Sequence, residues 1–146
     1  MKRFEERITI NASAGAVYDY VSDFTKHGEW AGHGLQVTPD ADGPMAVGST
    51  YSTVAKQFGT QREHSTVTEL SPGKAFAWES KGGLGLARHR FSLEDQSGST
   101  LLTKSAEIVE PTFLAKMLGW RLAKDIPSAL RADLEKIKTH LEGAPH

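Results

Sequence analysis

His89 and Lys104 are the two side chains whose predicted placement best suits catalysis. They lie on consecutive stretches of alternating apolar residues, which predict neighbouring antiparallel strands joined by a turn over residues 95–98. With that turn, His89 pairs with Lys104 and Phe91 pairs with Leu102, so all four side chains face the apolar side of the sheet. A turn of only two residues would shift this register and give Lys104 other neighbours.

An imidazole next to an ammonium in an apolar cavity has its pKa lowered by burial and by the like charge, so it stays neutral at pH 7. A neutral His89 would then be available to abstract a proton beside a ketone, while Lys104 would stabilise the enolate oxygen. The structural alternative is that Lys104 extends along a sheet edge into solvent and that His89 is half-exposed.

A second group of residues is expected to surround a ligand cavity. It consists of large apolar and aromatic side chains, with His64 as a candidate hydrogen-bonding group for a ligand carbonyl. The members are Trp30, Tyr51, His64, Phe76, Trp78, Phe91, Leu102, Phe113, Met117 and Trp120. Each apolar member alone is typical of a core, but together they exceed what a small core needs, and Tyr51 and Trp78 bring polar atoms to an apolar wall.

Composition excludes several other classes of protein. Cysteine is absent, which rules out disulfides, thiol nucleophiles and cysteine zinc sites. His27 and His33 lack a carboxylate at ligand spacing, so neither a metal nor another cofactor is expected. The 17 basic and 18 acidic residues argue against nucleic-acid binding. Without an apolar signal region or a run of about 18 apolar residues, we expect a cytoplasmic protein with no membrane span.

The elements that must position these residues follow from the hydrophobic period. Alternating, β-branched stretches predict strands over 4–10, 35–39, 49–58, 61–70, 75–80, 84–93 and 100–110. Two short helices are expected between the first two strands, the first capped by Ser13. A long helix is expected from Pro111 to about Leu141, kinked or restarted at Pro127. The chain thus predicts one α+β domain over 1–146, with 142–146 as a frayed tail.

Three segments resemble one family. They are residues 17–30 (VYDYVSDFTKHGEW), residues 47–51 (VGSTY) and residues 66–78 (TVTELSPGKAFAW). Together with the order of elements, they resemble the polyketide cyclase/dehydrase and lipid-transport superfamily, which includes START-like (SRPBCC) domains. The resemblance implies a helix-grip fold, in which about seven curved antiparallel strands surround the long C-terminal helix and enclose a cavity for an apolar molecule.

Three functions are consistent with such a fold. The first is a carrier that binds a small apolar ligand, such as a lipid, polyketide or related metabolite. The second is an enzyme of the cyclase, aromatase or dehydratase kind, which needs His89 and Lys104 in the cavity. The third is a protein-interaction module of the chaperone-activator type, which needs an exposed apolar patch, for example around Phe113 and Trp120. The sequence allows either a monomer or a homodimer.

Overall fold

The computed structural model describes residues 2–32, 34–56 and 60–143. The elements follow the predicted order of one strand, two short helices, six strands and a helical C-terminal segment. They are β1 (Lys2–Ile10), α1 (Ala14–Val21), η1 (Phe24–Glu29), β2 (Gln36–Pro39), β3 (Thr50–Lys56), β4 (Thr60–Ser71), β5 (Ala75–Gly82), β6 (Gly85–Asp95), β7 (Thr100–Pro111), α2 (Phe113–Met117) and α3 (Gly119–Glu142).

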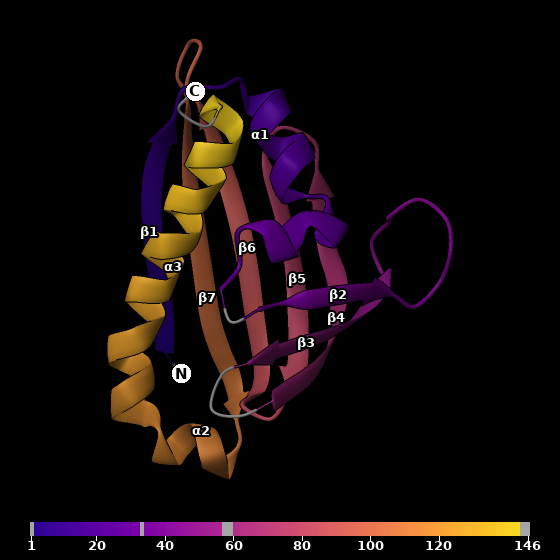
Figure 1. Cartoon of the computed structure of the whole chain (residues 1–146), viewed down its shortest axis with the longest axis vertical. Helices are drawn as coiled ribbons and strands as arrows, with labels where there is room; N and C mark the ends of the chain where they lie inside the picture. The colour runs from indigo at the N-terminus through magenta and orange to yellow at the C-terminus, as the bar shows by residue number, and fades with distance from the viewer. Residues whose placement is uncertain (1, 33, 57–59, 144–146) are drawn as a thin grey trace.

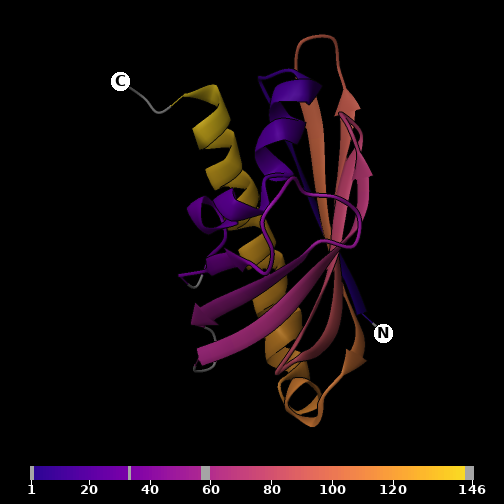
Figure 2. The same ribbon diagram turned by 90° about the vertical axis from the view of Figure 1, so that its right-hand side faces the viewer.

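The strands form a single antiparallel sheet that curls around the helices. Its order is β1-β7-β6-β5-β4-β3-β2, so β1 closes onto the last strand and the others form a meander. Figure 1 shows α3 running along the sheet on the side of β1 and β7, and Figure 2 shows α1, η1 and α3 on the same, concave face. The helix-grip fold is therefore confirmed. In the described part of the chain, no helix is long and apolar enough to cross a bilayer.

Local sequence explains the short helices. The Ser13 hydroxyl accepts a hydrogen bond from the Ala16 amide at 3.2 Å, which caps α1 as predicted. Asp23 caps η1 in the same way through the Thr25 amide. The two caps place α1 and η1 one after the other over the concave face of the sheet.

The β6–β7 hairpin has the predicted faces but a different register. Asp95 pairs with Thr100, and Gln96 N donates to Ser99 O at 2.8 Å, so the turn covers 96–99 rather than 95–98. From Ala87 to Asp95, each β6 residue therefore pairs two positions later than expected on β7, and a register shift between Leu86 and Ala87 adds one further position at the start of β6. His89 lies opposite Ala106, and Phe91 lies opposite Lys104. Because side chains alternate with period two, a shift by two residues leaves every side chain on its predicted face.

The C-terminal helix breaks at a different place from the one predicted. Leu118 separates α2 from α3, whereas Pro127 lies inside α3 and starts no new helix. A proline inside a helix costs about 3 kcal/mol, and each fully buried Leu or Ile returns about 1.5–3 kcal/mol. Leu130, Leu134 and Ile137, which recur on one face of α3 every three or four residues, are buried, and this packing outweighs the local cost.

Packing on the two faces of the sheet is as different as the alternation predicts. The convex face carries ion pairs, Arg88 with Glu79 at 2.7 Å and Arg90 with Glu69 at 2.9 Å. The concave face carries the aromatic core, in which the Phe24 ring stacks on Tyr51 at 4.6 Å between centroids. A charged side chain on the concave face therefore lies in mainly apolar surroundings.

Candidate ligand-binding site

A cavity of about 230 Å³ lies between the concave face of the sheet and α3. Strands β3 to β7 form one wall, η1 covers one end, and Leu122, Ile126 and Leu130 of α3 form the opposite wall. Both Lys104 and His89 line this cavity. Thus the two side chains for which the sequence predicted chemistry do face the same cavity.

Lys104 is a buried amine with few polar neighbours. Its Nζ lies 5.7 Å from the Trp30 ring, 5.9 Å from the Trp78 ring and 5.7 Å from the Phe91 ring. The carboxylate of Asp133 on α3 is 3.9 Å away, which is too long for a hydrogen bond. No hydrogen bond joins Nζ to any other residue that the structure describes. Burial lowers the pKa of Lys104, and the charge of Asp133 partly opposes that shift.

His89 is neutral inside the cavity wall. Its ring stacks on Trp78, with centroids 4.9 Å apart and planes inclined by 12°, and its Nε2 lies 3.2 Å from the Ser80 hydroxyl. Nδ1 is buried and has no hydrogen-bond partner among the described residues. Burial, then Lys104, then His27 lower the pKa of His89 to about 3. The predicted direction is confirmed, but so low a pKa makes His89 a weak base at pH 7.

His27 is a third buried polar group, which the sequence did not assign to the site. Its Nε2 lies 2.9 Å from the Val21 carbonyl, and its ring packs 5.0 Å from Trp78. Burial lowers the pKa of His27 to about 3, although the Val21 contact opposes the shift. A signal was present: Phe24, His27 and Trp30 are spaced by three, and a 3-10 helix has about three residues per turn. All three side chains therefore point to the core.

Asp133 is the other residue that sequence reasoning missed. It lies between Leu130 and Leu134, on the apolar stripe that packs α3 against the sheet. Its side chain is only 13% exposed. A carboxylate on a buried stripe is the signal that could have found it, because an unpaired charge there would be costly.

The structure brings only some of the predicted cavity residues to the inner cavity. Trp30 and Trp78 line the inner cavity. Other predicted members are core residues that contact neither solvent nor this cavity: Phe76, Phe91 and Leu102. His64 points to solvent on β4, opposite Ser52 and Lys81, so the structure does not bring it to the site.

Phe113, Met117 and Trp120 do not surround the cavity, contrary to the prediction. Their side chains are 78%, 61% and 76% exposed. Figure 1 shows the reason: α2 and the start of α3 lie beyond the ends of the strands, where the sheet no longer covers them. Together with Leu114 they form an exposed apolar patch, which is the feature that the interaction-module hypothesis requires.

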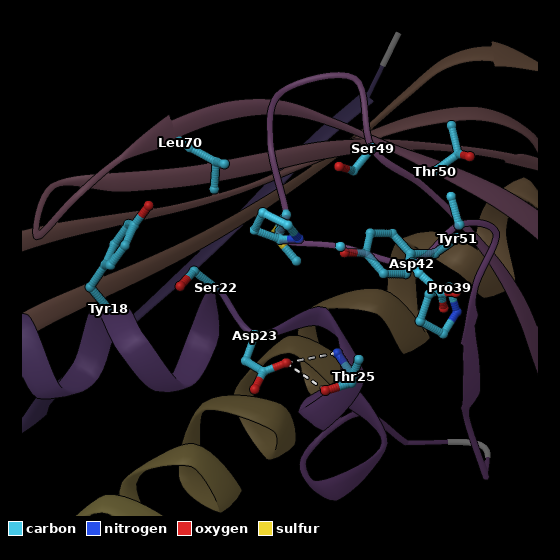
Figure 3. Close-up of a pocket in the computed structure, with 14 residues that line it drawn as sticks. Tyr18, Ser22, Asp23, Thr25, Pro39, Asp42, Ser49, Thr50, Tyr51 and Leu70 are labelled. Carbon is cyan, nitrogen blue, oxygen red and sulfur yellow. Dashed lines mark hydrogen bonds between the residues drawn. The ribbon is translucent and has the colours of Figure 1, made fainter.

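A second, larger pocket of about 530 Å³ lies at the other side of η1 (Figure 3). Tyr51, predicted for the inner cavity, lines this pocket instead, with Tyr18, Asp23 and the 41–45 loop. In Figure 3, the Asp23 carboxylate accepts hydrogen bonds from Thr25, including one from its amide at 3.1 Å. The Asp23 carboxylate therefore already has hydrogen-bond partners within its own helix cap. Because the inner cavity instead contains the buried His27, His89 and Lys104, it is the stronger candidate site.

Comparison with known proteins agrees with this architecture. The family model "Polyketide cyclase / dehydrase and lipid transport" matches residues 1–142, and the chain belongs to this family. No curated protein sequence matches the chain.

Solved structures with the same fold include an enzyme, a two-domain protein and a dimer. The Zhui aromatase/cyclase from Streptomyces sp. R1128 is 14% identical with a TM-score of 0.80, over 97% of this chain and 93% of that one. The di-domain ARO/CYC StfQ from the steffimycin biosynthetic pathway is 13% identical with a TM-score of 0.74, over 96% and 50%. The Aha1 dimer from Colwellia psychrerythraea is 20% identical with a TM-score of 0.70, over the full length of both chains. Identities this low show a shared fold alone.

Proposed function

We propose that the inner cavity binds a small, mostly apolar molecule that carries a carbonyl or another acceptor oxygen. One observation supports the proposal: in a cavity whose lining is mainly apolar but includes Glu63 and Asp133, Lys104 Nζ makes no hydrogen bond to the described residues, and Trp30 Nε1 and His89 Nδ1 are buried without a partner there. Buried polar groups are almost always hydrogen-bonded, and leaving one unpaired costs about 1–3 kcal/mol. A ligand oxygen would remove part of this cost.

The size of the cavity limits the ligand. An apolar cavity of about 150 Å³ is enough to hold benzene. The 230 Å³ inner cavity therefore has room for a molecule of one ring or a short chain. The family match and the aromatase/cyclase neighbour support a cyclic or ketone-bearing ligand.

A matched pair of probes tests this proposal. Acetophenone and α-methylstyrene have nearly the same shape, but only acetophenone has an acceptor oxygen. We expect acetophenone to bind about tenfold more tightly, because a hydrogen bond to a charged donor contributes about 1.5–3 kcal/mol. The preference should disappear in Lys104→Met, which keeps an unbranched side chain but removes the amine. Equal affinities for wild-type protein, measured by titration calorimetry, would contradict the proposed role of the acceptor oxygen.

The presence of His89 and Lys104 in the same cavity favours a second candidate function, aldol cyclisation and dehydration of a small diketone. Heptane-2,6-dione is a suitable probe, because closure of its ring with loss of water gives 3-methylcyclohex-2-enone, whose conjugated enone is followed by ultraviolet absorption. If His89 contributes, His89→Ala should reduce turnover while leaving acetophenone binding intact. Turnover no faster than in buffer would remove this candidate.

The exposed apolar patch of Phe113, Leu114, Met117 and Trp120 keeps the interaction-module hypothesis as a further candidate. Native mass spectrometry of the wild type and of the double variant Phe113→Ser, Trp120→Ser tests it through self-association. An oligomer that the double variant loses would support this candidate. A wild-type monomer across the concentration range would give it no support as a homodimer.

A further inference from the structure

Lys104 has the environment of a reactive amine rather than that of an ordinary structural lysine. Its side chain is 6% exposed, and three aromatic rings lie within 6 Å of Nζ, at 5.7, 5.9 and 5.7 Å. Lysine ammonium groups are normally strongly hydrated or hydrogen-bonded. Here three ring faces surround Nζ, and the nearest described carboxylate oxygen, Asp133 Oδ2, lies 3.9 Å from Nζ, too far for a hydrogen bond between the two.

Other lysines of the chain show the contrast. Lys138 donates to the Thr9 carbonyl at 2.8 Å and is paired with Glu142, so its charge is doubly satisfied. Lys56 donates to the Thr60 hydroxyl at 3.2 Å at the exposed end of its strand. Lys104 differs from both in that it is buried and lines a cavity of about 230 Å³.

Burial in apolar surroundings favours the neutral form of an amine, and the neutral form is the nucleophile. The geometry provides the other requirements. The cavity beside Nζ has room for a small carbonyl compound, and Asp133 is close enough to exchange protons with Nζ after a small rotation of either side chain.

We propose that Lys104 Nζ condenses reversibly with the carbonyl carbon of a small ketone or 1,3-diketone held in the inner cavity. This inference rests on the proposed function, since the same cavity must first admit the carbonyl compound. It adds a covalent step that ligand binding alone does not require.

The step balances without an external oxidant or reductant. The nitrogen lone pair forms a C–N bond as the C=O π bond breaks, and one of the two nitrogen protons moves to the oxygen to give a carbinolamine. Asp133 accepts a proton from the nitrogen and returns it to the hydroxyl, which leaves as water when the C–O bond breaks. The products are an imine and one water. With a 1,3-diketone, transfer of a proton from the adjacent carbon to the imine nitrogen gives a conjugated enaminone.

Pentane-2,4-dione is the probe for the first measurement. We expect wild-type protein to develop near-ultraviolet enaminone absorption, and intact mass spectrometry should show one adduct equal to the diketone minus water. Peptide mapping should place it on Lys104, with labelling at least tenfold faster than that of exposed lysines such as Lys74. Lys104→Arg should lose the fast adduct, whereas the matched variant Lys138→Arg should keep it.

A parallel measurement on wild-type protein separates this inference from the proposed function. Acetophenone binding is followed by calorimetry, and cyanoborohydride is then added to reduce any imine to a stable secondary amine. Binding without labelling of Lys104 by either probe would overturn the covalent step and leave the proposed function intact. Failure of both binding and labelling would overturn both. Labelling of Lys104 at the rate of the exposed lysines would also overturn the inference, because it would show no activation by the cavity.

Discussion

Replacing Asp133 with asparagine tests whether Lys104 carries a charge inside the cavity. The two side chains are 6% and 13% exposed, and Nζ lies 3.9 Å from Oδ2. At an effective dielectric constant of about 20, opposite charges at this 3.9 Å separation attract by about 4 kcal/mol. Because the neutral amide is cheaper to bury than the carboxylate, part of this loss is recovered. We expect the free energy of unfolding to fall by about 3 kcal/mol at pH 7.

The loss should depend on pH in a defined direction. Burial lowers the pKa of Lys104 in the folded state, so the unfolded chain binds more protons and stability rises with pH. Without Asp133 the pKa of Lys104 falls further, and loss of its proton removes the cost of burying an unpaired charge. Relative to the unfolded chain, deprotonation of Lys104 costs at most about 4.6 kcal/mol at pH 7 and about 1 kcal/mol at pH 9.5. The effect of Asp133→Asn should therefore shrink between pH 7 and pH 9.5.

Urea denaturation followed by tryptophan fluorescence at the two pH values measures both effects. Asp125→Asn is a matched control on the same helix, because Asp125 forms an exposed pair with Arg121 at 3.4 Å. That pair should contribute no more than about 0.5 kcal/mol. A loss below about 1 kcal/mol for Asp133→Asn at pH 7 would refute the reasoning and show that Lys104 is already neutral. The double variant Lys104→Met, Asp133→Leu should be close to the wild type in stability.

Three further predictions concern the rest of the fold. Burial and Lys104 lower the pKa of His89 to about 3, so the free energy of unfolding should fall as the pH drops from 6.5 towards 3. In urea denaturation, His89→Phe should reduce the slope of this fall by up to about 1.4 kcal/mol per pH unit. Equal slopes for variant and wild type would argue against a buried neutral imidazole. Phe113→Ser and Trp120→Ser should each change the free energy of unfolding by less than about 0.5 kcal/mol, since both side chains are exposed, and a loss above about 2 kcal/mol would show that they are packed. Gly85→Ala should cost at least about 2 kcal/mol more than Gly98→Ala: both glycines have φ near +106°, but only at Gly85 would a Cβ overlap the backbone of β7. Thermal denaturation compares the two, and equal losses would contradict the overlap.

The faces of the strands could be predicted from the sequence, but the exact neighbours could not. Alternation places His89 and Lys104 on the concave face whichever four-residue turn joins β6 to β7. The segment from Asp95 to Ser99 admits either turn, and the choice depends on Ser97 and Gly98, which take positive φ values of 59° and 107°. Sequence alone does not say which of several polar residues adopts that conformation.

In the first part of the C-terminal helix, the sequence did not predict which apolar side chains are buried. Apolar residues around most of its circumference predict burial on most sides. Ala115 and Leu122 are indeed buried, but Phe113, Met117 and Trp120 are exposed. The same pattern arises when a helix extends past the edge of its sheet and leaves an apolar patch. Only the position of α2 relative to the strand ends, which no periodicity encodes, distinguishes the two cases.

The Lys104–Asp133 contact could not be predicted from the sequence, and it lies in the candidate ligand-binding site. Their contact depends on how α3 is placed along β7, which local patterns do not specify. A domain that needed only stability would do as well with apolar residues at both positions, because such replacements are often neutral or stabilising. Departures from the local rules of folding are expected where a site must hold polar groups ready for another molecule. A buried ammonium among three aromatic faces, beside two imidazoles that stay neutral, fits a ligand with an acceptor oxygen better than it fits a core.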